Sequence, residues 1–135
     1  MIKIICVGRI KEKFYVDAIE EYKKRLSKYT NLEIIELEDE KTTDKEVAIR
    51  KESERIEKYI SQKDYVISLA IDGKELSSTE LASKMDNIFI SYSNITFIIG
   101  GSLGLSKEIK DKSNMLLSFS KITFPHQLFI KFLYY

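Results

Sequence analysis

The sequence contains few of the residues that build metal centres, disulfide frameworks and nucleophilic triads. Its 135 residues include one cysteine, one histidine, one proline and no tryptophan. One cysteine cannot form an internal disulfide, and one histidine has no second histidine or cysteine to complete a metal coordination shell. The pattern G-x-x-x-x-G-K-[ST] is absent, and G-x-S-x-G occurs only as the glycine turn G-G-S-L-G at residues 100–104. We expect no metal site, no serine triad and no nucleotide hydrolysis of the P-loop type.

The chain also lacks an excess of charge and a long apolar run. Its 22 Lys and Arg residues and 21 Asp and Glu residues leave a formal net charge of +1. A nucleic-acid partner would require basic residues gathered on one face or supplied by an oligomer. No apolar run approaches the roughly 20 residues of a membrane span, and the amino terminus lacks a signal-peptide cleavage pattern. These absences predict a cytoplasmic protein without membrane segments, and the length predicts one domain.

Apolar stretches alternate with amphipathic stretches along the whole chain. This alternation predicts an α/β fold with a mostly parallel sheet flanked by helices on both faces. The expected strands are residues 2–8, 32–38, 65–71, 95–99 and 115–119, and a helix is expected after each of the first four. Asp72 and Gly73 are expected to turn the chain after the third strand. Cys6 lies inside the first apolar run, which favours a buried, unreactive thiol over a nucleophile.

Side-chain spacing predicts where each helix begins and which face it buries. Asp44, Ser77 and Ser106 are the expected N-caps, and Glu80 follows Ser77 by three residues, as in a capping box. The expected inward positions are Tyr15, Ala18, Ile19, Tyr22, Leu26 and Tyr29 in the first helix, Val47, Ile49, Ile56, Tyr59 and Ile60 in the second, and Leu81, Ala82, Met85 and Ile88 in the third. The charges of the second helix predict a solvated face, with a binding surface as the alternative.

The stretch from Asn94 to Ser106 is the first candidate for a ligand site. An apolar strand there is followed by G-G-S-L-G and then by a short helical segment. Open α/β sheets bind ligands at the carboxyl ends of their strands, where a glycine lets the backbone approach closely. Because the pattern does not match G-x-G-x-x-G, a purely structural turn is at least as good an interpretation as a ligand cradle.

The second candidate is the stretch from Ser118 to Gln127, which follows the last expected strand. Its hydroxyl groups, main-chain amides and apolar side chains suit a nucleoside-like ligand. Pro125 suits the first turn of a helix. His126 is the only histidine in the chain, and an unperturbed histidine, with a pKa of about 6.5, can do acid–base work. The alternative is an ordinary loop-to-helix junction with a locally packed histidine.

Four blocks of sequence carry a resemblance to a known family. In chain order they are V-G-R-I-K-E-K-F (7–14), L-A-I-D-G-K-E-L-S-S (69–78), I-G-G-S-L-G-L-S (99–106) and L-S-F-S-K-I-T-F-P-H-Q (117–127). Together they closely resemble the pseudouridine-N3 methyltransferases of large-subunit ribosomal RNA, which belong to the SPOUT class. The resemblance extends from Met1 to about Leu128.

The resemblance implies a homodimeric, cytoplasmic enzyme with a trefoil knot that binds S-adenosylmethionine. Such an enzyme methylates N3 of a pseudouridine in large-subunit (23S) rRNA on the assembled ribosome. The cofactor contacts that the resemblance implies are Leu69, Gly100, Phe119, Ser120, Lys121, Ile122, Thr123 and Phe124. The group that removes the N3 proton stays unidentified, with His126 as a candidate.

The resemblance ends in the last residues of the chain. Family members continue past P-H-Q-L with a helix that carries arginine, glutamate, glutamine and tyrosine, whereas this chain continues F-I-K-F-L-Y-Y to Tyr135. We therefore expect residues 1–135 to be a single SPOUT methyltransferase domain with a shortened carboxyl end, which can leave the knot incomplete. One alternative is an inactive remnant that acts at most as a binding or dimerisation module. Another is a flavodoxin-like nucleotide-binding module, which only the strand–helix alternation supports.

Overall fold

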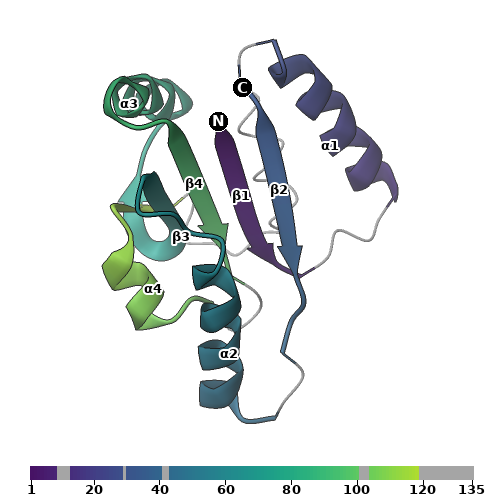
Figure 1. Cartoon of the computed structure of the whole chain (residues 1–135), viewed down its shortest axis with the longest axis vertical. Helices are drawn as coiled ribbons and strands as arrows, with labels where there is room; N and C mark the ends of the chain where they lie inside the picture. The colour runs from purple at the N-terminus through teal and green to yellow at the C-terminus, as the bar shows by residue number, and fades with distance from the viewer. Residues whose placement is uncertain (9–12, 29, 41–42, 101–103, 119–135) are drawn as a thin grey trace.

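Five parallel strands form one sheet in the part of the chain that the structure describes (Figure 1). The computed structural model describes residues 1–8, 13–28, 30–40, 43–100 and 104–118. The strands are β1 (Ile2–Val7), β2 (Leu32–Leu37), β3 (Asp64–Glu75), β4 (Asn94–Ile99) and β5 (Met115–Ser118). The helices are α1 (Lys13–Leu26), α2 (Lys45–Glu57), α3 (Ser78–Ser91) and α4 (Lys107–Lys112). The strand order is β2-β1-β4-β3-β5 with every neighbouring pair parallel, so the predicted fold class is confirmed.

The sheet is covered by an apolar layer on each face. The α3 layer consists of Ile2, Ile4, Cys6, Leu32, Ile67, Leu81, Ile88, Ile95, Phe97, Ile99 and Leu117. The α2–α4 layer consists of Ile5, Val7, Leu37, Ile56, Val66, Ile98 and Ile109. Neighbouring strand residues such as Ile4 and Ile5 belong to opposite layers because successive side chains in a strand point to opposite faces. Both layers are apolar, which explains the nearly continuous apolar runs of the strands.

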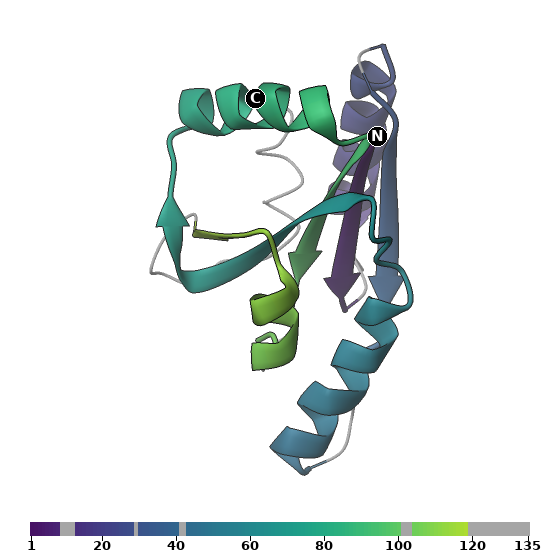
Figure 2. The ribbon, with the colours of Figure 1, turned by 60° about the vertical axis from the view of Figure 1, so that its left-hand side comes forward.

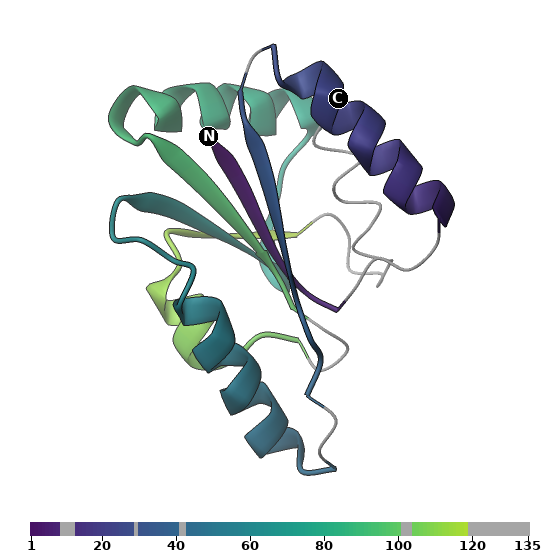
Figure 3. The same cartoon turned by 45° about the vertical axis from the view of Figure 1, so that its right-hand side comes forward.

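The helices are distributed over both faces and both ends of the sheet. In Figure 2, α3 crosses one end of the strands, whereas α2 and α4 lie toward the other. Figure 3 shows α1 alongside β2 and α2 extending beyond the carboxyl ends of the strands. No helix in the described ranges is both long and apolar enough to cross a membrane.

Asp64 is a buried carboxylate at the amino end of β3. Its side chain has no exposed surface, and its Oδ2 lies 3.2 Å from Lys3 Nζ of β1. Oδ2 also accepts hydrogen bonds from the Ser61 backbone N–H and from Thr96 Oγ1, and Oδ1 accepts one from Asn94 Nδ2. Burial alone would raise the pKa of Asp64, but these hydrogen bonds outweigh it and hold the pKa below its ordinary value. One carboxylate therefore joins β1, β3 and β4.

The third strand is longer than the sequence predicts. Asp72 and Gly73 do not end it, because β3 continues beyond them with a register shift against β5. Leu117 of β5 pairs with Leu69 before the shift and with Lys74 after it. The predicted end of the strand is wrong because a local Asp-Gly signal does not reveal that β5 offers hydrogen-bond partners on both sides of the irregularity. The chain does bend at the predicted place, because residues 70–73 lie between the two pairings with Leu117.

All three expected N-caps are confirmed. Asp44 accepts hydrogen bonds from two backbone N–H groups in the first turn of α2. Ser77 Oγ accepts from the Glu80 N–H at 3.1 Å, and Glu80 Oε1 accepts from the Ser77 N–H at 3.0 Å, which completes the capping box of α3. Ser106 Oγ accepts a backbone N–H of α4 at 3.2 Å. These caps were visible in the sequence because each depends only on residues three or fewer positions apart.

The buried face of α2 differs from the predicted one. The buried residues of this helix are Ala48, Glu52, Ser53 and Ile56. Ile56 is thus confirmed as an inward position, and Ile60 packs against the α2–α4 layer just beyond the helix. Val47 and Ile49 are only half-buried. Tyr59, predicted to face inward, is 43% exposed.

Glu52 explains why apolar spacing misplaced that face. It lies one turn from Ala48 and one turn from Ile56, so a carboxylate occupies the middle of the buried stripe. Its Oε2 accepts a hydrogen bond from the Glu40 backbone N–H at 2.9 Å. Its Oε1 has no hydrogen-bond partner among the described residues. A polar residue that is buried to bind a loop backbone is invisible to a search for apolar periodicity.

The remaining helix predictions are partly confirmed. In α3, Leu81 and Ile88 are buried and Met85 is half-buried, but Ala82 is exposed. In α1 the helix is confirmed and Ala18 is half-buried. The side chains at the other predicted inward positions of α1 lie outside the described residues, namely Tyr15, Ile19, Tyr22, Leu26 and Tyr29.

We expect Asp64→Asn to lower the free energy of unfolding by roughly 3 kcal/mol, because it leaves Lys3 without its buried counter-charge. Urea denaturation at neutral pH measures this change. The matched control is Glu21→Gln, which breaks the exposed Arg25–Glu21 pair and should change stability by less than about 0.5 kcal/mol. Equal effects of the two substitutions would contradict the role assigned to Asp64.

The stability of the wild type and that of Asp64→Asn should respond differently to acid. A carboxylate whose pKa is depressed in the folded state stabilises the fold above its unfolded pKa, and this contribution is lost as the pH falls through the folded pKa. The stability difference between the wild type and Asp64→Asn should therefore narrow below about pH 4. Denaturation curves recorded between neutral pH and acid pH measure this narrowing.

Candidate cofactor site at the carboxyl edge

The carboxyl ends of β1 and β4 meet at the point where the strand order reverses. From β1 the chain moves to β2 on one side, while β4 lies on the other. Cys6 of β1 pairs with Ile99 of β4, so Gly8 and Gly100 leave the sheet at the same edge. Gly8 has φ of 110°, a conformation that favours glycine, and its N–H donates to the Leu37 carbonyl at 2.6 Å. Open α/β sheets bind ligands at such a switch point.

Gly100 is required by the loop itself. A Cβ at this position would lie 2.8 Å from the carbonyl carbon and 2.9 Å from the carbonyl oxygen of Gly104, and 3.1 Å from Leu105 Cδ2. The space beside Gly100 is therefore filled by the returning backbone, so any ligand contact from Gly100 would come from its main chain. Gly104 has φ of +80°, and a Cβ there would meet nothing within 4 Å. Residues 101–103 lie outside the described residues.

Leu69 lies at the same edge, beside the last described strand. It is half-buried and packs against the α3 layer, so part of its apolar surface stays accessible. It pairs with Leu117, whose neighbour Ser118 is buried and is the last described residue. Because β3, β4 and β5 are parallel, the segment that follows Ser118 starts at the edge where Gly100 lies. The two candidate stretches therefore begin at the same end of the sheet.

The other predicted site residues cannot be placed. Phe119, Ser120, Lys121, Ile122, Thr123 and Phe124 lie outside the described residues, as do Pro125 and His126. The knot expected from the resemblance depends on the path of the chain after Ser118, so it stays a prediction. The described part of the edge has two features suited to an S-adenosylmethionine-like ligand. Leu69 offers a half-buried apolar side chain, and Gly100 offers main-chain polar groups.

Cys6 belongs to the fold and not to the chemistry of this edge. The thiol is fully buried in β1, and burial together with the charge of Glu36 raises its pKa to about 12. A thiol with that pKa is not a nucleophile at neutral pH, so the prediction of a buried, unreactive cysteine is confirmed. Among residues 1–118, with the gaps stated above, no three His, Cys, Asp or Glu side chains gather in a way that could hold a metal ion.

A groove of about 550 Å³ lies away from this edge, along α3. Tyr65, Leu76 and Tyr92 form its apolar wall, and Ser83 and Asn87 of α3 face it. The rings of Tyr65 and Tyr92 meet edge to face, with centroids 5.3 Å apart. Neither Leu69 nor Gly100 lines this groove, so it is distinct from the predicted cofactor site.

Comparison with known proteins identifies the class of protein to which this chain belongs. The family described as "Predicted SPOUT methyltransferase" matches residues 1–134. The chain therefore belongs to the SPOUT methyltransferase family.

Relatives within that family share one name. "Ribosomal RNA large subunit methyltransferase H" from Streptococcus uberis is 54% identical, over 94% of this chain and 84% of its own. The protein of the same name from Caldicellulosiruptor saccharolyticus is 49% identical, over 96% of this chain and 86% of its own. A "Putative ribosomal RNA large subunit methyltransferase H" from Methanococcus maripaludis is 54% identical, over 94% of this chain and 84% of its own.

We expect Gly100→Ala to destabilise the protein in the absence of any ligand, by roughly 1–3 kcal/mol, because the added methyl group collides with the Gly104 backbone. Thermal unfolding of the ligand-free protein measures this. Gly104→Ala is the matched control, because it adds a methyl group to open space and costs only the left-handed backbone strain, roughly 1 kcal/mol. A ligand-free Gly100→Ala protein as stable as the wild type would show that the loop does not close on Gly100.

Proposed function

We propose that this protein is an S-adenosylmethionine-dependent methyltransferase that acts on N3 of a pseudouridine in large-subunit ribosomal RNA on the assembled ribosome. The observation that carries the proposal is the convergence of Leu69, Gly100 and the start of the segment after Ser118 at one edge of the sheet. The names of relatives at 54% identity support ribosomal RNA as the substrate class. The four sequence blocks support the finer assignment to pseudouridine N3. Residues 1–135 would act as one domain, within a cytoplasmic homodimer.

The proposed cofactor site assigns different tasks to different groups. Leu69 would pack against the adenine ring, while the Gly100 main chain and the segment 119–124 would contact the rest of the adenosine. When bound, S-adenosylmethionine supplies a methyl group to a nucleophilic nitrogen. For that transfer the protein mainly has to hold the two reactants in line and to accept the N3 proton, a task for which His126 is the candidate.

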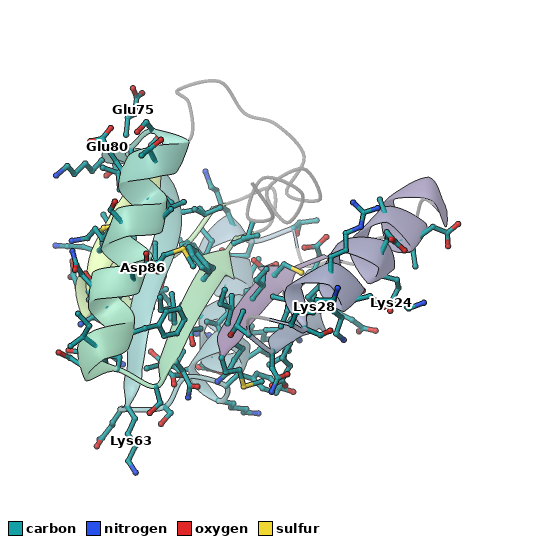
Figure 4. All side chains as sticks on the ribbon, turned by 90° about the horizontal axis from the view of Figure 1, so that it is seen from above. Lys24, Lys28, Lys63, Glu75, Glu80 and Asp86 are labelled. Atoms are coloured by element: carbon teal, nitrogen blue, oxygen red, sulfur yellow. The ribbon has the colours of Figure 1, made fainter. Side chains whose placement is uncertain are left out.

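The charged surface suggests which side of the molecule faces RNA. Lys24 and Lys28 are exposed at the carboxyl end of α1, as Figure 4 shows from above. Glu75, Glu80 and Asp86 instead lie around α3 on the other side of the same view. Phosphate groups attract lysine side chains and are repelled by carboxylates. We therefore propose that the α1 side approaches the ribosomal RNA.

The cofactor assignment is tested by calorimetric titration of the folded protein with S-adenosylmethionine. We expect saturable binding by the wild type and roughly tenfold weaker binding by Leu69→Ala, because the substitution removes an apolar wall worth about 1.4 kcal/mol of contact. Ile34→Ala is the matched control, because Ile34 also packs half-buried against the α3 layer but lies within β2. It should lower stability and leave the affinity unchanged. No detectable binding by a folded wild type would refute the cofactor assignment.

Methyl transfer to ribosomes that lack the modification tests the substrate. Incorporation of labelled methyl groups into large-subunit rRNA, at a pseudouridine located by mass spectrometry, is the expected result. Binding of the cofactor without methyl transfer would favour the alternative of an inactive binding or dimerisation module. Methylation of a different nucleotide would support the assignment as an rRNA methyltransferase but refute the assignment to pseudouridine N3.

We expect the double substitution Lys24→Glu, Lys28→Glu to reduce methylation of ribosomes about tenfold or more at low salt and to leave S-adenosylmethionine affinity unchanged. Two phosphate-binding charges are reversed, so the deficit should shrink as salt is added. Lys63→Glu is the control, because Lys63 is also exposed but precedes β3, and Figure 4 shows it away from α1. Equal loss of activity with Lys63→Glu would place the RNA elsewhere.

A further inference from the structure

Two stretches of β3 contact the same residue of β5. Leu69 pairs with Leu117, and Lys74, five positions later, pairs with Leu117 again. We call residues 70–74 the β3 collar, since they carry the chain from the first of these pairings to the second. The curve of β3 is visible in Figure 2. The collar therefore determines where Leu117 lies, and Leu117 is one residue from the end of the described chain.

Gly73 is the tightest point of the collar. A Cβ at this position would lie 2.8 Å from the carbonyl carbon of Leu116 and 2.8 Å from the nitrogen and carbonyl carbon of Leu117. All three are backbone atoms, which no side-chain rotation can move away. Gly73 does not have a positive φ, so the fold requires glycine here because it lacks a side chain and not because of its backbone conformation. Any larger residue must push β5 away from the collar.

The collar is also connected to the helix that follows the glycine loop. Lys110 of α4 lies 3.6 Å from Asp72 Oδ1. After α4 the chain is held on β3, because Asn114 Oδ1 accepts from the Val66 N–H at 2.7 Å and the Asn114 N–H donates to the Val66 carbonyl at 2.8 Å. These contacts join β3, α4 and β5 into one unit. A displacement of β5 at the collar therefore changes the spacing between Leu69, Gly100 and the carboxyl end of β5.

We propose that Gly73 is a positioning residue for the cofactor site. It does not touch the ligand; it lets β5 lie against the collar, so that Leu117 and Ser118 end the described chain beside Leu69. This inference rests on the proposed function, because it concerns the same S-adenosylmethionine site. Asp72 supports the arrangement through Lys110, and since that pair is largely exposed its contribution is the smaller one.

The test compares Gly73→Ala with Asp64→Asn, which weakens the sheet at its amino end, far from the collar. Both variants are titrated calorimetrically with S-adenosylmethionine at a temperature at which both are folded. We expect Gly73→Ala to bind about tenfold or more weakly, because a shift of a few tenths of an ångström misplaces the pocket walls. Asp64→Asn should bind as the wild type does. Equal affinities of the two variants would overturn the inference, since Gly73 would then be purely structural.

If Gly73→Ala does not fold, Asp72→Asn decides the question. Breaking the exposed Asp72–Lys110 pair should leave the melting temperature within about 2 °C of the wild type and weaken cofactor binding about two- to fivefold. Unchanged affinity would overturn the inference. The wild-type titration distinguishes failure of the proposed function from failure of this inference. If the wild type does not bind S-adenosylmethionine, the proposed function is refuted. If the wild type binds and the variants bind with the same affinity, only the role of the collar is refuted.

Discussion

The arrangement of the sheet depends on one buried carboxylate. Asp64 accepts hydrogen bonds or an ionic contact from Lys3, Asn94 and Thr96, which come from β1 and β4. A carboxylate without exposed surface tolerates burial only when its oxygens are satisfied, so β1 and β4 must both approach β3 at this point. Because the three strands are parallel and paired in register, their carboxyl ends lie together at the opposite edge of the sheet.

The amino edge and the carboxyl edge of the sheet have different roles. The amino edge holds the satisfied charges and contributes stability. The carboxyl edge is built from close backbone contacts at Gly100 and Gly73, where a Cβ would lie within 3 Å of another strand or loop. Contacts of this kind are intolerant of small displacements because backbone atoms cannot rotate out of the way. In the proposed reaction, such rigidity would help to hold a sulfonium methyl group in line with a base nitrogen.

Local features were predictable from the sequence, and features that depend on distant segments were not. The caps at Ser77 and Ser106 follow from residues within one turn, and the strands follow from apolar runs that both layers of the core require. The buried face of α2 was misjudged because Glu52 is buried to accept a backbone N–H from the loop before the helix. The end of β3 at Asp72 was misjudged because β5, more than forty residues away, pairs with β3 beyond it. Glycines at the candidate site were noticed from the sequence, but the neighbour that each one accommodates was not.

The sequence by itself determined the strand–helix alternation, the fold class, the unreactive character of Cys6 and the family resemblance. These follow from short-range periodicity, composition and motif order. Only the tertiary structure decided which contacts Gly100, Gly73 and Asp64 make. The Gly104 backbone leaves no room for a Cβ at Gly100, and the β5 backbone leaves none at Gly73. Asp64 of β3 is bonded to residues of β1 and β4. The physical reason is that a clash or a buried charge is a property of two segments in contact, and the sequence specifies each segment without stating which other segment it will meet.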